Sequence, residues 1–77
     1  MIYKSKKQFI MKGFIKIIDT RDQEYYINID YIIQFTTTSE NQEGNTIIDI
    51  KYGERVSTIQ TNSTVEEVLL MIVSSNK

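Results

Sequence analysis

Apolar and polar residues alternate along much of the chain between residues 14 and 61, and a period of two predicts β-strands. In the first such stretch, Ile15 and Ile17 fall on one face and their polar and apolar neighbours on the other. The last stretch is rich in β-forming residues but alternates poorly, so the pattern does not assign which of its faces points to the core. The predicted strands are 14–18, 24–29, 32–38, 46–52 and 55–61.

The alternation also assigns the faces of the middle strands. One face of each strand is expected to lie against the core, and the residues between them face solvent or a second layer. The three sets assigned to one face are Tyr25, Ile27 and Ile29, then Ile33, Phe35 and Thr37, then Ile48, Ile50 and Tyr52.

Polar segments separate the strands and predict the turns. Residues 19–23 form a turn, residues 28–31 include a short corner, and residues 39–45 form a longer loop. Gly53 stands between two strand patterns, where glycine reaches a positive φ without penalty, so it indicates a tight hairpin.

The period changes after residue 62 and predicts one helix. Ser63 or Thr64 is the expected N-cap, and a glutamate three residues later closes a capping box. On a helical wheel, one apolar arc is wide enough to pack on a sheet, and it leaves two apolar residues on the other side with the glutamates. The packing arc is Val65, Val68, Leu69, Ile72 and Val73, and the other side is Glu66, Glu67, Leu70 and Met71.

We therefore predict an α+β fold that is mostly β, an antiparallel meander of about five short strands with a C-terminal helix packed on one face. Residues 1–13 form a basic N-terminal extension and residues 14–77 a single domain. A chain of 77 residues buries a small core, and this one has neither cysteine nor histidine for disulfides or the usual zinc sites. Association with itself or a partner remains as the added source of stability, with a marginally stable monomer as the alternative.

Charge is unevenly distributed: residues 1–16 carry +5 and residues 17–77 carry −6. The basic arm is a solvated segment or a contact for an anionic surface. The excess of acid in the rest of the chain repels phosphates, so we expect no nucleic-acid partner and interpret the strand tyrosines as packing residues rather than a base-stacking platform. The lysines of this arm are Lys4, Lys6, Lys7 and Lys12.

The residues that most often carry chemistry are absent, so we expect a protein that is not an enzyme and holds no cofactor. A Ser–Lys dyad stays open, although nothing places such a pair. Asp19, Asp22 and Glu24 are acidic residues of a turn, with a Ca²⁺ or Mg²⁺ site as the alternative. We also expect no membrane span and a cytoplasmic location, since no apolar run is long enough and the N-terminus lacks a signal-peptide core.

Four segments resemble the small flagellar FlbD-like family, which includes the swarming-motility protein SwrD. The resemblance covers residues 14–72 and implies an accessory protein without catalytic residues, which supports flagellar motor output through protein contacts. Charged residues follow the "E-E-V" sequence in that family, whereas Leu70 and Met71 stand here. The segments are "FIKIIDT" (14–20), "YYINIDYI" (25–32), "NTIIDIKYGERV" (45–56) and "TVEEVLLMI" (64–72).

The hypothesis drawn from these observations is a protein-interaction module that forms homo-oligomers or binds a protein partner. Its expected interface is Leu70 and Met71 with Glu66 and Glu67 beside them. One alternative is a small phage or mobile-element inhibitor whose acidic body blocks a basic bacterial protein. Another is a weak nucleic-acid binder that uses the N-terminal lysines.

Overall fold

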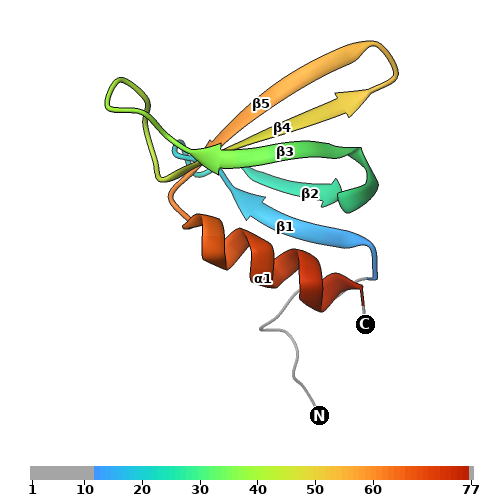
Figure 1. Cartoon of the computed structure of the whole chain (residues 1–77). Helices are drawn as coiled ribbons and strands as arrows, with labels where there is room; N and C mark the ends of the chain where they lie inside the picture. Colours follow the sequence, from blue (N-terminus) through green and yellow to red (C-terminus); the bar gives the residue numbers. More distant parts are fainter. Residues whose placement is uncertain (1–11, 77) are drawn as a thin grey trace.

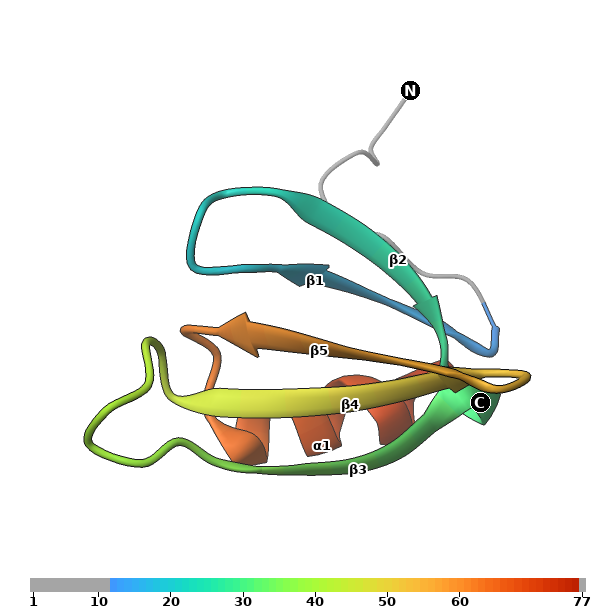
Figure 2. The same cartoon turned by 90° about the horizontal axis from the view of Figure 1, so that it is seen from above.

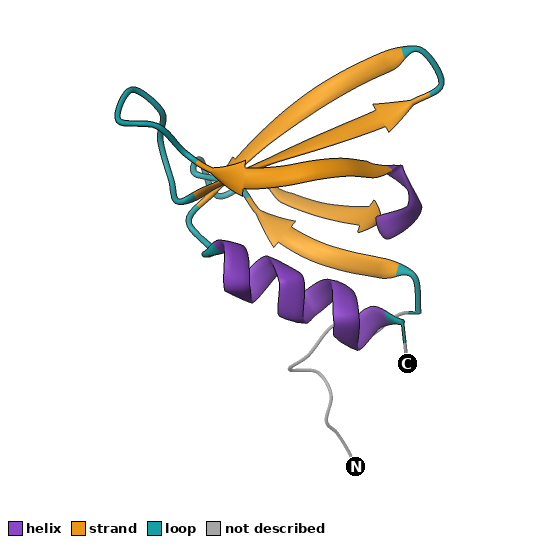
Figure 3. Ribbon diagram, viewed as in Figure 1, coloured by secondary structure: helices purple, strands orange, loops and turns teal. Residues whose placement is uncertain are grey.

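Five strands, a short 3-10 helix and one α-helix follow one another along residues 12–76, the part of the chain that the computed structural model describes. All strand pairs are antiparallel, and the predicted α+β class is confirmed (Figures 1 and 3). The elements are β1 (Phe14–Ile18), β2 (Glu24–Asn28), η2 (Ile29–Tyr31), β3 (Ile32–Thr37), β4 (Thr46–Tyr52), β5 (Arg55–Thr61) and α1 (Val65–Ser75).

The strands form two sheets, a β1–β2 hairpin and a β3–β4–β5 meander. The 3-10 helix η2 turns the chain between β2 and β3, so these consecutive strands do not pair. At this predicted corner, the Asn28 side chain accepts a hydrogen bond from the backbone N–H of Asp30 at 2.9 Å, because asparagine favours such local bonds.

The ends of β1 and β5 join the two sheets at a seam, which we define as residues 18–20 with residues 60–61. Asp19 and Thr61 form an isolated antiparallel bridge, and the Thr20 N–H donates to the Gln60 carbonyl at 3.0 Å. The buried Thr61 hydroxyl donates to the Ile18 carbonyl at 2.8 Å. Elsewhere the sheets diverge, as Figure 1 shows, and α1 packs in contact with β1 and β3.

The core lies between the two sheets and the helix, and most of it is isoleucine. β-Branched side chains suit strands because their restricted rotamers pack well on a pleated surface. Each fully buried isoleucine contributes about 1.5–3 kcal/mol through removal of apolar surface from water. The predicted inward faces of β1 and the middle of β4 are confirmed, and β5 turns its C-terminal half inward. The core residues are Ile15, Ile17, Ile27, Ile48, Ile50, Ile59 and Val68.

Two predicted faces are wrong. In β3 the register shifts between Ile32 and Gln34, so Ile32 and Phe35 both pack on the core while Ile33 is 57% exposed. A bulge of this kind inserts one residue and breaks the alternation on which the prediction rested. At the end of β4, Tyr52 is exposed because the β4–β5 hairpin projects past the core, and its ring packs edge-to-face on Tyr31 at 5.1 Å.

Gly44 closes the end of the molecule where the 38–45 loop meets the seam. Its φ is +81°, and a Cβ there would lie 2.5 Å from the Thr61 carbonyl oxygen and 2.9 Å from the Thr20 methyl group. The neighbouring Asn45 N–H donates to the same Thr61 carbonyl at 2.7 Å. The absence of a side chain at Gly44 therefore lets the loop approach β5 closely.

Gly13 ties the start of β1 to the end of α1 and to the start of η2. Its N–H donates to the Ser75 carbonyl at the end of α1, and its carbonyl accepts from the Ile29 N–H, each at 2.9 Å. Lys12 and Gly13 are the only residues of the predicted extension 1–13 within the described range. Within that range, no helix has the length and apolar character needed to cross a membrane.

Candidate interaction surface

Helix α1 is anchored at its N-terminus by the predicted capping box. Thr64 is the N-cap, its hydroxyl accepts from the Glu67 N–H at 3.1 Å, and the Glu67 carboxylate accepts from the Thr64 N–H at 2.7 Å. These bonds satisfy backbone donors that have no partner inside the helix. Glu67, one of the four residues of the expected interface, therefore has a structural role in starting the helix.

The inward face of α1 differs from the predicted packing arc. Val68 is fully buried, Met71 and Ile72 pack on the core, and Ser75 is buried at the C-terminal end. The predicted arc instead included Leu69 and Val73, which are about half exposed. At 100° per residue, the helix is rotated by about 80° relative to the wheel prediction.

Four neighbouring residues on the opposite side form what we call the outer face of α1: Glu66, Leu69, Leu70 and Val73. Their spacing of i, i+3, i+4 and i+7 places them in one stripe. Leu70 is 66% exposed, Leu69 51% and Val73 49%. Leu70 and Glu66 thus lie on the exposed stripe as predicted, while Met71 lies against the core.

Sequence reasoning missed Leu69 and Val73 as surface residues. One pattern in the sequence would have predicted their exposure. Val68, Met71, Ile72 and Ser75 follow helical spacing, and if this stripe faces the core, Leu69 and Val73 face outward. A serine at the end of an apolar stripe draws little attention in a hydrophobicity pattern. Here its hydroxyl donates to the Ile72 carbonyl at 2.8 Å, which allows it to be buried.

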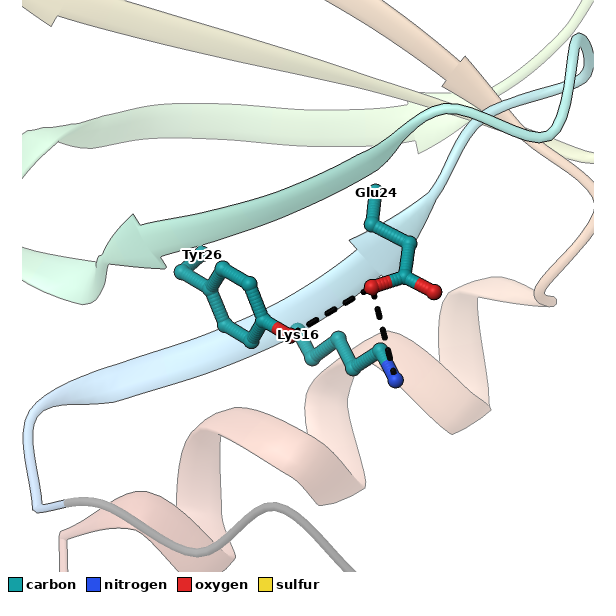
Figure 4. Close-up of polar contacts among 3 residues, drawn as sticks. All are labelled: Lys16, Glu24 and Tyr26. Carbon is teal, nitrogen blue, oxygen red and sulfur yellow. Dashed lines mark hydrogen bonds and ion pairs between the residues drawn. The ribbon is translucent and has the colours of Figure 1, made fainter.

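The outer face of the β1–β2 hairpin carries a small polar network. Lys16 and Glu24 form an ion pair with 3.8 Å between nitrogen and oxygen, and the Tyr26 hydroxyl donates to the same carboxylate oxygen at 3.4 Å (Figure 4). Lys16 and Tyr26 are register partners on the two strands, and Glu24 lies diagonally across from Lys16, opposite Ile18. An exposed ion pair of this kind contributes little to stability, so the network marks a solvated surface.

The outer face of the three-stranded sheet is also polar. Asp49 accepts hydrogen bonds from Gln34 at 2.8 Å and from Thr58 at 3.1 Å, and the three residues form a ladder across β3, β4 and β5. Cross-strand pairs like these satisfy one another. Val56 of β5 and Ile33 at the β3 bulge are also exposed, whereas the outer face of α1 groups three exposed apolar residues at helical spacing.

The acidic turn at Asp19 is held by its own backbone. The Asp19 carboxylate accepts from the N–H groups of Arg21 at 2.8 Å and Gln23 at 2.9 Å, and from the Tyr25 hydroxyl at 3.2 Å. The Gln23 bond, helped by the other two, holds the pKa of Asp19 below its usual value. Desolvation and the bond to Asp19 raise the pKa of Tyr25.

The metal alternative at this turn has no support in the geometry. Within residues 12–76, no three acidic side chains gather closely enough to hold a metal ion. The Asp19 oxygens are occupied as hydrogen-bond acceptors, as expected for an acidic residue that initiates a turn. The strand tyrosines do not gather on one surface. Tyr25 bonds to Asp19 at this turn, whereas the rings of Tyr31 and Tyr52 pack edge-to-face on each other at 70°.

Charge separates along the molecule. Residues 12–76 carry all ten acidic residues and five of the nine basic ones, since three lysines of the basic arm (Lys4, Lys6 and Lys7) and Lys77 lie outside the described range. The turn 19–23, the 38–45 loop and the start of α1 lie at one end (Figures 1 and 2). That end holds Asp19, Asp22, Glu40, Glu43, Glu66 and Glu67.

The opposite end holds three basic residues together with two acidic ones, Asp30 in η2 and Glu54 in the β4–β5 turn. Lys12 precedes β1, and Lys51 and Arg55 flank the β4–β5 turn. The Gly13–Ser75 hydrogen bond places the exposed Lys12 beside the C-terminus of α1. The helix therefore has carboxylates at its start and a lysine next to its end, which matches the sign of its dipole at both termini.

Comparison with known proteins identifies no relative: no protein-family model, curated protein or solved structure matches the chain.

Proposed function

We propose that the protein is a non-enzymatic protein-interaction module that acts through the outer face of α1. The observation that carries this proposal is the exposed stripe of Leu69, Leu70 and Val73 on a helix that is capped and packed. Contiguous apolar surface on a small protein favours a protein contact, and a helix face is a common form of such a contact.

The buried polar groups of the interior hold the fold together. In residues 12–76, every buried side-chain nitrogen or oxygen has a hydrogen-bond partner. Thr46 donates to the Ser63 carbonyl at 2.6 Å, Thr61 to Ile18 and Ser75 to Ile72, so the buried hydroxyls hold elements together. The buried hydroxyls thus have structural roles.

The resemblance to the FlbD-like family supports the same proposal. Its "YYINIDYI" segment coincides with β2 and η2, its hairpin segment with β4 and β5, and "TVEEVLLMI" with the cap and body of α1. An accessory role through protein contacts would use α1, where Leu70 replaces the charged residues of that family. A cytoplasmic location belongs to this proposal.

Site-specific photo-crosslinking tests the proposal. A photoreactive residue replaces Leu70 on the outer face of α1, or Thr58 on the polar face of the sheet, in the cells that make the protein. We expect protein adducts from position 70 and none from position 58, identified by mass spectrometry. Adducts of equal yield from both positions, or none from position 70, would contradict it.

The acidic end of the molecule favours a second candidate, an inhibitor that binds a basic protein surface. Glu43 lies there on the 38–45 loop and accepts a hydrogen bond from Thr20 at 3.1 Å. Opposite charges across an interface accelerate and orient association. A third crosslinking position at Glu43 separates the two candidates, because adducts from position 43 without adducts from position 70 would favour the inhibitor.

A further inference from the structure

Resting on the proposed function, we propose that the partner of the outer face of α1 is a second copy of this chain, with the two helices packed antiparallel across a twofold axis near Leu70. A twofold contact uses the same surface on both copies, so that surface must be complementary to itself. The outer face of α1 meets this condition in both shape and charge.

The charges at the two ends of the stripe are the reason to choose a second copy of the chain as the partner. Glu66 lies at the start of the stripe, and the Gly13–Ser75 bond at 2.9 Å holds Lys12 beside the other end. An antiparallel pair directs Glu66 of each copy toward Lys12 of the other copy. Two symmetric attractions of opposite charge then flank a centre made of Leu69, Leu70 and Val73.

The same residues exclude a parallel pair. Parallel packing would bring Glu66 of one copy against Glu66 of the other, so two carboxylates would meet at one end. Like charges in proximity are destabilising, and the aligned helix dipoles would add to the repulsion. The antiparallel arrangement also places the positive start of each helix near the negative end of the other.

The length of the helix suits this contact. Eleven residues give α1 a length of about 16 Å, with Leu70 near its middle. Apolar residues at i, i+1 and i+4 fill the centre of a helix–helix contact, while the ends remain accessible to the charged side chains. Glu67 takes no part, because its carboxylate is bonded in the capping box.

The mass of the purified protein in solution, measured by sedimentation or light scattering at increasing concentration, tests the proposal. We expect a species of twice the 9.0 kDa chain mass. Leu70→Lys and, independently, Val73→Lys should give monomers with an unchanged circular dichroism spectrum. Thr58→Lys, the matched control on the sheet, should leave the dimer intact. A wild-type protein that stays monomeric, or a dimer insensitive to both helix variants, would overturn the proposal.

A charge exchange tests the antiparallel geometry. Glu66→Lys or Lys12→Glu alone should raise the dissociation constant about 3- to 30-fold, because two attractive pairs become repulsive. The double variant should restore affinity, since each exchanged pair is again attractive. Both single effects should shrink at high salt. Double variants that bind as weakly as the single ones would rule out this arrangement.

Failure of this inference is distinguishable from failure of the proposed function. A monomeric purified protein that forms adducts with a different protein from position 70 overturns the dimer and leaves the interaction module standing. Adducts of the protein with itself from that position support both.

Discussion

Single residues decide how closely the segments of this fold approach, and Gly44 and Gly53 show the difference. Both have a positive φ, +81° and +61°, which side chains with a Cβ rarely adopt. Only at Gly44 would the Cβ also collide with backbone, the Thr61 carbonyl at 2.5 Å, whereas nothing lies within 4 Å of the position at Gly53.

Gly53→Ala should therefore lower the free energy of unfolding by about 1–2 kcal/mol, the cost of the left-handed conformation alone. Gly44→Ala should cost distinctly more, about 3 kcal/mol or above, because backbone must also move. Thermal unfolding followed by circular dichroism compares them, at about 4–8 °C per kcal/mol for a domain of this size. Equal shifts in the two variants would show that the loop moves away freely.

The two glycines also differ in how well the sequence pattern predicts their roles. The turn at Gly53 was predictable from the sequence because this residue separates two strand patterns, whereas Gly44 sits in a polar loop whose pattern places no constraint on the residue type. Its constraint comes from Thr20 and Thr61, which are distant in sequence. A contact with distant partners leaves no local signal.

At the scale of the elements, α1 shows the limit of periodicity. The pattern predicted the helix, its cap and its approximate length, because these depend on neighbouring residues. It did not predict the rotation of the helix, since apolar residues cover more than one face. That rotation depends on packing against β1 and β3 and on the Gly13–Ser75 bond.

A pair of alanine substitutions tests this rotation. Met71→Ala should reduce the free energy of unfolding by about 1–2 kcal/mol, less than the 2–5 typical of a fully buried methionine, because Met71 is partly exposed. Leu70→Ala, one residue away, should change it by no more than about 0.5 kcal/mol. Urea titrations at low protein concentration, where association adds nothing, measure both. The reverse order would support the wheel prediction instead.

The strands show the same division. Isoleucines at alternate positions identified the inward faces of β1 and of the middle of β4. The alternation failed at Ile33, where a bulge adds a residue, and at Tyr52, where the strand continues beyond the core. The first failure depends on the pairing of β3 with β4, and the second on how far the core extends along β4. The pattern of a single strand encodes neither.

At the scale of the whole molecule, the seam converts two sheets into one fold. The sequence predicted a meander because consecutive strands usually pair, but η2 separates β2 from β3 and the seam joins β1 to β5. The grouping of acidic residues at one end likewise appeared only in the fold, where Thr20 of the 19–23 turn region donates to Glu43 of the 38–45 loop.

Thr61→Val tests the seam by removing the hydroxyl that donates to the Ile18 carbonyl at 2.8 Å. Loss of this partly buried hydrogen bond should cost about 0.5–1.5 kcal/mol. Hydrogen exchange should also accelerate at the Thr20 amide, which bonds across the seam, more than at amides between β4 and β5. Thr58→Val is the matched control, since its hydroxyl bond to Asp49 is exposed. Similar losses of unfolding free energy in both variants would mean that the Thr61 hydrogen bond across the seam adds no more stability than an exposed one.

The position of α1 after all five strands in the element order has a consequence for synthesis of the chain. All five strands leave the ribosome before α1, so the inward isoleucines of β1 and β4 lack the cover of Val68 until the helix has been made. During that interval the nascent sheet exposes apolar surface and unpaired strand edges, the features that make folding intermediates aggregate. Chaperone dependence should therefore fall once residue 75 has emerged.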